Sequence, residues 1–210
     1  MNRIPVLLVA AVTLTLPCVA GLINPGFETG DFTGWTTFTT PGGTLGTGFP
    51  NVTLFDTDNN GSASNSAEFN VGGPGGGGIL QNVALGAGTL QIDIDIAVKG
   101  GPLDNGSGGV FTLFVDGAAV DTFDFGGVSA VVSVFGSLNA NLAVGAGLHE
   151  IRIQMTRPFL HSINTPTQYL DNIVLSGSAV LADVPEPSQG LGILLALAVI
   201  QCTRRKELRA

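Results

Sequence analysis

The sequence predicts an all-β protein, an antiparallel β-sandwich flanked by an N-terminal signal peptide and a C-terminal hydrophobic helix. Three observations support this fold class. Apolar and polar residues alternate with period two in many short segments, Gly-rich turns separate these segments, and no long stretch between the two ends has helical periodicity. The 210 residues therefore divide into a signal peptide at 1–20, a single β-domain at 21–183 and a C-terminal signal at 184–210.

The first segment, Met1–Ala20, has the layout of a secretory signal peptide. A basic residue, Arg3, precedes the apolar run Ile4–Leu16, and the segment ends in the small residue Ala20. Signal peptidase reads small residues at such a position. We therefore expect signal peptidase to act on this chain during export and the mature chain to start at Gly21.

The last segment combines an extended motif, a short apolar run and a basic end. The motif consists of Val184, Pro185, Glu186, Pro187 and Ser188, and the basic end contains Arg204, Arg205 and Lys206. The prolines restrict the motif to an extended backbone. The 15 residues from Ser188 to Cys202 span about 22 Å as a transmembrane helix, less than the ~30 Å of a hydrocarbon core. The basic end favours the cytoplasmic side, so the domain before the motif is expected outside.

This order of features resembles the PEP-CTERM sorting signal of Gram-negative bacteria, which a membrane protease of the exosortase type reads. The resemblance covers Val184–Arg209 and departs from the family in its rather short apolar run. It implies a transient tether in the inner membrane, cleavage near the motif, and release to the cell surface or the extracellular matrix, among exopolysaccharide or biofilm material. The alternative is an ordinary C-terminal anchor that stays in place.

The middle segment, 21–183, is strongly acidic and contains no cysteine. It has 14 acidic and 3 basic residues, and both cysteines, Cys18 and Cys202, lie in the terminal segments. Disulfide and thiol chemistry are therefore not expected of this domain. Nucleic acid is excluded as a partner, because phosphate binding needs a basic surface. The charge suits a protein that meets divalent cations, and solubility explains it equally well.

Nine parts of the middle segment are predicted to be strands. In the clearest of them, Gln91–Ile96, isoleucines face one side and aspartates the other. Val110–Val115 and Ala118–Phe125 flank Asp116-Gly117, a two-residue hairpin signal. The other predicted strands are Trp35–Phe38, Val52–Phe55, Ala67–Val71, Ile79–Leu85, His149–Met155 and Tyr169–Leu175, and Gly72–Gly78 is predicted to be a flexible loop.

Both ends of the middle segment resemble galactose-binding-like jelly rolls, a fold common in carbohydrate-binding modules and in PEP-CTERM proteins. The opening residues, Leu22–Trp35, resemble the first motif of that family, and Tyr169–Leu175 resembles its closing strand. The resemblance implies a jelly roll in which Glu28 and Asp171 share a structural calcium ion. Calcium takes hard oxygen ligands and would link the two ends of the domain. The alternative is that these acids cap local turns by hydrogen bonding.

A second candidate metal site lies in the sequence Asp56–Gly61. Asp56, Asp58 and Asn60 match the first half of an EF-hand loop, but Ala67 stands where that loop needs a bidentate acid. Clusters of Asp, Asn and Gly are also ordinary turn sequences. The pattern favours a turn over a calcium site.

The sequence contains no motif for catalysis. His149 is predicted on the apolar face of a strand and His161 in a loop, and Asp93 and Asp95 share the polar face of a strand. We therefore expect a non-enzymatic, exported protein. The alternatives are a carbohydrate-binding module with a defined glycan ligand, and a hydrolase of matrix polymers. Against a sugar site, the aromatic residues are predicted to pack in the core, namely Trp35, Phe111, Phe114, Phe123, Phe125 and Phe135.

Overall fold

The computed structural model describes residues 21–72, 75–159 and 165–180, and within these ranges all regular structure is β. Twelve strands follow one another along the chain: β1 Thr36–Thr39, β2 Asn51–Phe55, β3 Ser64–Phe69, β4 Gly77–Leu85, β5 Gly88–Lys99, β6 Gly106–Ser107, β7 Val110–Val115, β8 Ala118–Asp124, β9 Gly127–Val128, β10 Ser133–Val144, β11 Gly147–Thr156 and β12 Thr167–Ser176. The described residues include no helix long and apolar enough to cross a membrane.

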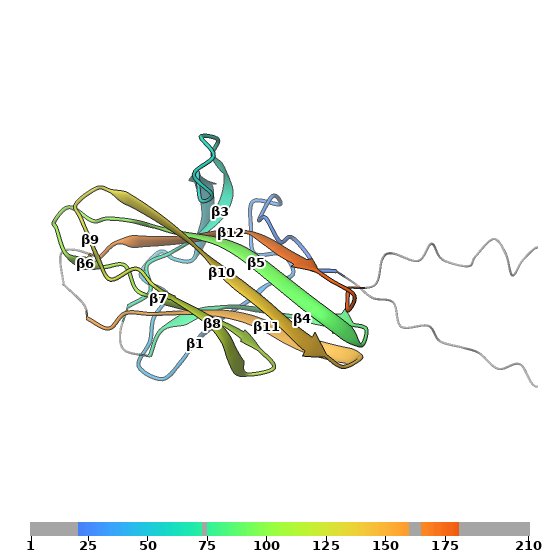
Figure 1. Ribbon diagram of the computed structural model, residues 1–210. Helices are drawn as coiled ribbons and strands as arrows, with labels where there is room; N and C mark the ends of the chain where they lie inside the picture. Colours follow the sequence, from blue (N-terminus) through green and yellow to red (C-terminus); the bar gives the residue numbers. More distant parts are fainter. Residues whose placement is uncertain (1–20, 73–74, 160–164, 181–210) are drawn as a thin grey trace, which may run out of the picture. The chain divides into compact units, whose positions relative to one another are not determined.

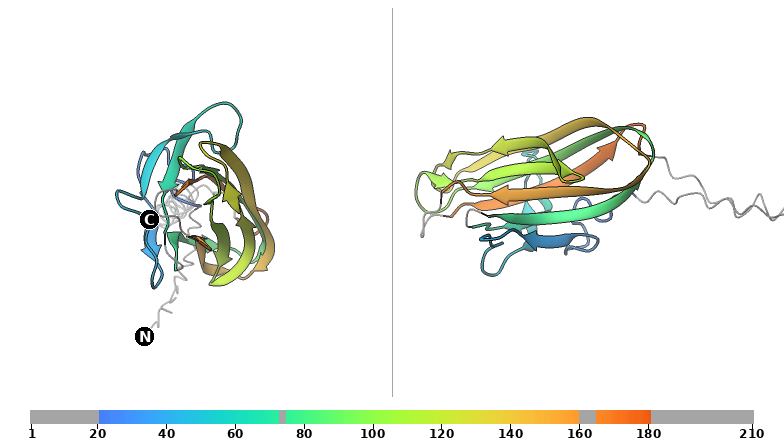
Figure 2. Two further views of the ribbon diagram at one scale, coloured as in Figure 1. Left: turned by 90° about the vertical axis from the view of Figure 1, so that its left-hand side faces the viewer. Right: turned by 90° about the horizontal axis from the view of Figure 1, so that it is seen from below.

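Ten of the strands form two five-stranded antiparallel sheets that face each other (Figure 1). The lower sheet of Figure 1 has the order β1-β4-β11-β7-β8, and the upper sheet has the order β10-β5-β12-β3-β2. The short strands β6 and β9 pair with each other. The chain passes repeatedly between the sheets, as in a jelly roll, so the predicted antiparallel sandwich is confirmed. Figure 2 shows the two layers end-on and from below.

The core lies between the sheets and is built by the alternating positions of the long strands. In β5 the residues Leu90, Ile92, Ile94, Ile96 and Val98 are all buried, and the polar residues between them face outward. Ile151, Ile153 and Met155 of β11 complete the core from the lower sheet. Burying such side chains contributes about 1.5–3 kcal/mol each, so the period-two pattern supplies the main stabilising term.

Each of the nine predicted strands coincides with an observed one, within a few residues at the ends. The hairpin at Asp116-Gly117 is also confirmed, because both residues have positive φ angles, 51° and 78°, as this turn requires. Two expectations need correction. The strand β10 was not predicted, and the end of the Gly72–Gly78 run is not a loop. Gly77 and Gly78 begin β4, where a Cβ atom on Gly78 would collide with the backbone of β11.

A buried arginine joins three separate segments at one end of the sandwich. Arg157 is 3% exposed and donates hydrogen bonds to the backbone carbonyls of Val71, Ser107 and Pro166. Burial lowers the pKa of its guanidinium to about 10, well above neutrality. The side chain therefore remains charged and satisfies three buried acceptors that belong to different segments of the chain.

The strands β8 and β10 close one side of the sandwich. The backbone N–H of Asn139 on β10 donates to the carboxylate of Asp121 on β8, at 2.7 Å. The ring of Phe123 lies directly over Gly136, where any Cβ atom would be 2.7 Å from it. Two edge strands from different sheets thus meet through a side chain and not through a backbone ladder.

The predicted signal peptide, the sorting motif Val184–Ser188 and the basic end Arg204–Lys206 lie outside the described residues, as does His161.

Candidate functional site

The outer face of the lower sheet carries an arginine between two phenylalanine rings. Period-two alternation turns Phe38 of β1, Phe114 of β7 and Arg152 of β11 away from the core. The guanidinium carbon of Arg152 lies 4.4 Å from the ring centroid of Phe114 and 5.8 Å from that of Phe38. Such distances are within the range of cation–π attraction. We call these three side chains the Phe–Arg platform.

Polar side chains surround the platform on the same face. Arg152 pairs with Leu80 and Phe114 in the sheet register, and the neighbouring row contains Gln154 and Thr112. The carboxylate of Glu150 lies 3.6 Å from Nε of Arg152, and that Nε has no hydrogen-bond partner among the described residues. The side chain of Arg152 is 25% exposed, although its Nε atom is buried. The face therefore offers flat apolar rings next to hydrogen-bonding groups.

The upper sheet presents its aromatic residues differently. The ring of Tyr169 is stacked on that of Phe55, with centroids 3.8 Å apart, and its hydroxyl donates to Glu68 at 3.0 Å. Tyr169 is therefore almost fully buried, although it lies on the outer side of the sheet. The ring of Tyr169 is therefore not available for stacking on a ligand.

Two of the aromatic residues that were predicted to be core residues are not part of it. Phe111 and Phe125 are buried, as expected, and Phe123 packs against the core. Phe114, however, belongs to the Phe–Arg platform, and Phe135 faces outward from the upper sheet, in register with Ala97. The correction follows from parity, because Phe114 stands between two buried residues of β7 and must face the opposite side.

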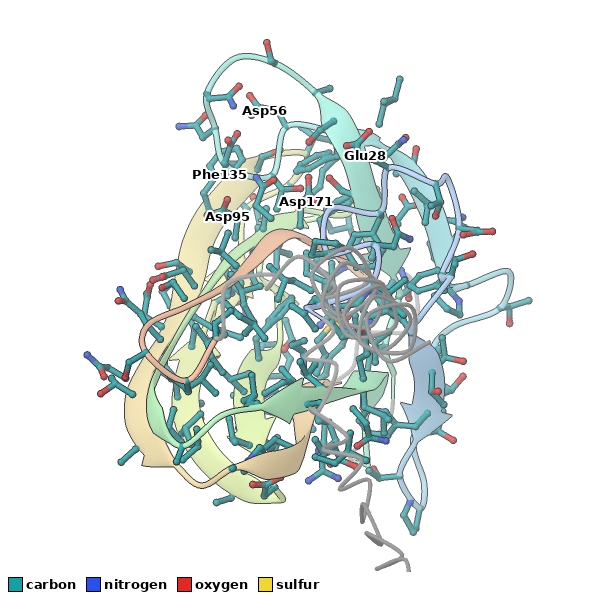
Figure 3. All side chains as sticks on the ribbon, turned by 90° about the vertical axis from the view of Figure 1, so that its right-hand side faces the viewer. Glu28, Asp56, Asp95, Phe135 and Asp171 are labelled. Carbon is teal, nitrogen blue, oxygen red and sulfur yellow. The ribbon has the colours of Figure 1, made fainter. Side chains whose placement is uncertain are left out.

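The structure brings Glu28 of the opening segment near Asp171 of the upper sheet, as Figure 3 shows. Asp171 lies at a β-bulge of β12 and is 1% exposed. Its carboxylate accepts hydrogen bonds from the hydroxyls of Ser64 and Ser66, at 2.7 and 3.3 Å, and from the backbone N–H of Asn172. Burial raises the pKa of this carboxyl, and the negative charge of Glu28 adds to the shift.

The opening motif supplies Glu28 to this cluster through a tight local turn. Phe27 is fully buried with a positive φ of 54°, and the carbonyl of Pro25 accepts the N–H of Ile173 at 3.1 Å. Among the described residues no basic group forms an ion pair with either carboxylate. Two carboxylates and the nearby hydroxyls are hard oxygen donors of the kind that calcium accepts, so the donor set fits this ion.

The loop Asp56–Gly61 directs its side-chain oxygens at its own backbone. Asp56 accepts the N–H groups of Asn60 and Gly61, at 3.0 Å each, and Asp58 accepts the N–H of Asn60 at 3.1 Å. Asn60 in turn accepts the N–H of Ser62 at 2.7 Å. These contacts are those of Asx turns. A calcium site with Asp56, Asp58 and Asn60 stays a prediction that would require several of these bonds to open.

The other residues considered for catalysis, His149, Asp93 and Asp95, lie at two different places in the fold. His149 bonds to Asp116 at the turn between β7 and β8, as described below. Asp95, on the outer face of the upper sheet (Figure 3), accepts the side-chain amide of Asn172 at 2.9 Å, and Asp93 stands two residues away on the same strand. Among the described residues no three His, Cys, Asp or Glu side chains gather closely enough to hold a metal ion by themselves.

The sequence matches no family model and no curated protein. Solved structures similar to this chain include a family 61 carbohydrate-binding module in complex with β-1,4-galactotriose. It is 16% identical with a TM-score of 0.44, over 74% of this chain and 96% of the module. The CBM22-1–GH10 modules of a Clostridium thermocellum xylanase, complexed with xylohexaose, are 15% identical with a TM-score of 0.44, over 77% of this chain and 29% of theirs. A family 35 module from Paenibacillus barcinonensis is 20% identical with a TM-score of 0.36, over 70% of this chain and 95% of the module. These likenesses concern the fold.

Proposed function

We propose that this domain is a non-enzymatic polysaccharide-binding module and that its binding face is the outer face of the lower sheet. The Phe–Arg platform is the observation that carries the proposal. The C–H faces of a sugar ring pack on aromatic rings, while guanidinium, carboxylate and amide groups bond its hydroxyls. Phe38, Phe114, Arg152, Glu150 and Gln154 supply both kinds of contact side by side.

An open sheet face suits an extended polymer better than a small molecule. The platform extends across four adjacent strands, from β1 through β4 and β11 to β7. Small-molecule sites are usually concave and enclosed, whereas these side chains stand on a sheet surface. We therefore assign an extended glycan, and not a monosaccharide, as the ligand.

Alanine substitution on the two sheets tests the binding face. Phe114→Ala and Arg152→Ala are each expected to lower the affinity for a glycan identified on an array by at least about tenfold, which is 1.4 kcal/mol. Phe135→Ala removes the same ring from the upper sheet and should leave the affinity unchanged. Isothermal titration calorimetry measures all three variants, with melting temperatures as the control for folding.

Two results would overturn this assignment. One is loss of binding in Phe135→Ala with full binding in Phe114→Ala. The other is absence of binding to every polysaccharide of a panel that includes acidic and neutral polymers. Release of reducing ends from a polymer, abolished by His149→Ala, would instead support the hydrolase alternative.

We further propose that Glu28 and Asp171 hold a calcium ion that stabilises the domain. The support is the pair of close carboxylates, one of them buried, without a basic partner in the described part of the chain. The ion would neutralise their repulsion and join the opening segment to β12. Its removal is one of the two predictions argued in the Discussion.

The proposed surroundings are outside the cell, and this proposal depends on the sequence of the two ends. The signal peptide and the Val184–Ser188 motif support export, transient tethering and cleavage by an exosortase. The intact mass of the protein recovered from the medium checks this. We expect the mass of a chain that ends near Ser188. A released protein that still contains Arg204 and Arg205 would contradict cleavage.

A further inference from the structure

We propose that His149 and Asp116 form a pH-dependent latch that fastens the β7–β8 turn to the β10–β11 turn. Nδ1 of His149 lies 2.7 Å from Oδ2 of Asp116, and Nε2 lies 3.0 Å from the backbone carbonyl of Gly145. Asp116 belongs to the first turn and Gly145 to the second. One imidazole ring thus bridges two connections that are 29 residues apart in the sequence.

Both contacts of the ring are with acceptors, and this decides its protonation state. A carboxylate and a backbone carbonyl can each accept a hydrogen bond, and neither can donate one. A neutral imidazole carries a single N–H, so one of its nitrogens would direct a lone pair at an acceptor. The imidazolium form carries two N–H groups and satisfies both contacts. The closed latch therefore requires the charged histidine.

The carboxylate is held in place independently of the histidine. Oδ1 of Asp116 accepts the backbone N–H of Glu150 at 3.0 Å, and the left-handed backbone of Asp116 and Gly117 fixes the turn. The side chain of His149 is 13% exposed, whereas that of Asp116 is 51% exposed and reaches solvent. Protonation of the ring can thus change the contact without first having to order its partner.

Asp116 is the charged group that faces the ring. Glu150, the next residue of β11, points to the other face and lies beside Arg152. The neighbouring strand β4 places Val83 opposite His149 and contributes no charge at this position. The hydrogen bond to Asp116 raises the pKa of His149, and the same bond lowers the pKa of Asp116.

These directions define the pH range of the latch. The ordinary pKa of histidine is about 6.5, and because the folded value is higher, the stabilisation is complete below about pH 6.5 and is lost as the pH rises through the folded value. The contribution of Asp116 has the opposite sign. It is present above about pH 4 and is lost as the pH falls through its lowered pKa. The latch is therefore closed in mildly acidic solution and opens as the pH rises above the raised pKa of His149.

Titration of the histidine ring by NMR tests the latch in the intact protein. The ring of His149 is expected to titrate at a higher pH in the wild type than in Asp116→Asn, which keeps the shape of the side chain but not its charge. Asp124→Asn, which removes the same charge elsewhere, should leave the value unchanged. The assignment of the signal comes from His161→Gln.

A second measurement separates a latch from an isolated ion pair. Between pH 5.5 and pH 9, hydrogen exchange in the β7–β8 and β10–β11 turns should accelerate more in the wild type than in His149→Gln, after correction for intrinsic rates. The same pKa of His149 in the wild type and in Asp116→Asn would overturn the proposal. So would turn exchange with the same pH dependence in the wild type and in His149→Gln.

Discussion

Arg157→Met is expected to destabilise the domain by at least about 3 kcal/mol. Methionine keeps the apolar stem of the side chain but donates no hydrogen bond, so the carbonyls of Val71, Ser107 and Pro166 lose a buried donor. Each buried group left unsatisfied costs about 1–3 kcal/mol. For a domain of this size the melting temperature should fall by about 6–12 °C. Chemical denaturation measures the change in the free energy of unfolding.

Two further variants make the result specific to the buried contacts. Lys99→Met removes an exposed positive charge and is expected to change the stability by less than about 0.5 kcal/mol. Arg157→Lys keeps the charge, but its single ammonium group cannot match the fork of the guanidinium, so an intermediate loss is expected. Equal stability of Arg157→Met and Lys99→Met would show that Arg157 does not hold the three segments together.

Removal of calcium is expected to have the second largest effect, because it leaves two carboxylates in repulsion. An ion present at about 100 times its dissociation constant stabilises the folded state by about 2.7 kcal/mol. The wild type should therefore melt about 5–10 °C higher in calcium than in chelator. Differential scanning calorimetry in both buffers measures this difference.

Asp171→Asn sharpens the test. Whether the variant or the wild type is the more stable protein should depend on the presence of calcium. In calcium the variant should be the less stable protein, since it loses a charged ligand. In chelator it should be at least as stable as the wild type, since burial of the Asp171 carboxylate is unfavourable and raises its pKa. Asp93→Asn, on the same sheet, should respond to calcium as the wild type does. Identical melting of the metal-free wild type in both buffers would refute the site.

Most of the fold could be predicted because most of the long strands bury one face. The isoleucines of β5 and β11 mark the core side directly, and the Asp116-Gly117 turn sets one hairpin. The strand β10 was missed although Val134, Leu138 and Leu142 also alternate. Its asparagines, glycine and serines are common in turns and infrequent in strands. Pairing along the whole of β5 overrides these local preferences.

The candidate site was predicted in part, for different reasons at different residues. The proximity of Glu28 and Asp171 was implied by the resemblance of the two ends of the domain to galactose-binding-like jelly rolls. The outward direction of Phe114 could have been inferred from the alternation of side chains in β7, because both of its neighbours face the core. Its contact with Arg152 could not, because it depends on the register between β7 and β11, strands that are separated by three others in the sequence. The role of Arg157 depends in the same way on carbonyls up to 86 residues away.

The contact between Asp121 and Asn139 has a consequence for how copies of this protein behave at high concentration. An exposed strand edge offers unpaired N–H and C=O groups on which a strand of another molecule can be added, and this is a route to aggregation. Here β8 and β10 turn their edges toward each other, and a carboxylate occupies one N–H that a foreign strand would need. A charged side chain at that point also repels the acidic surface of a second copy. The same contact that closes the sandwich thus opposes strand addition at the edges of β8 and β10.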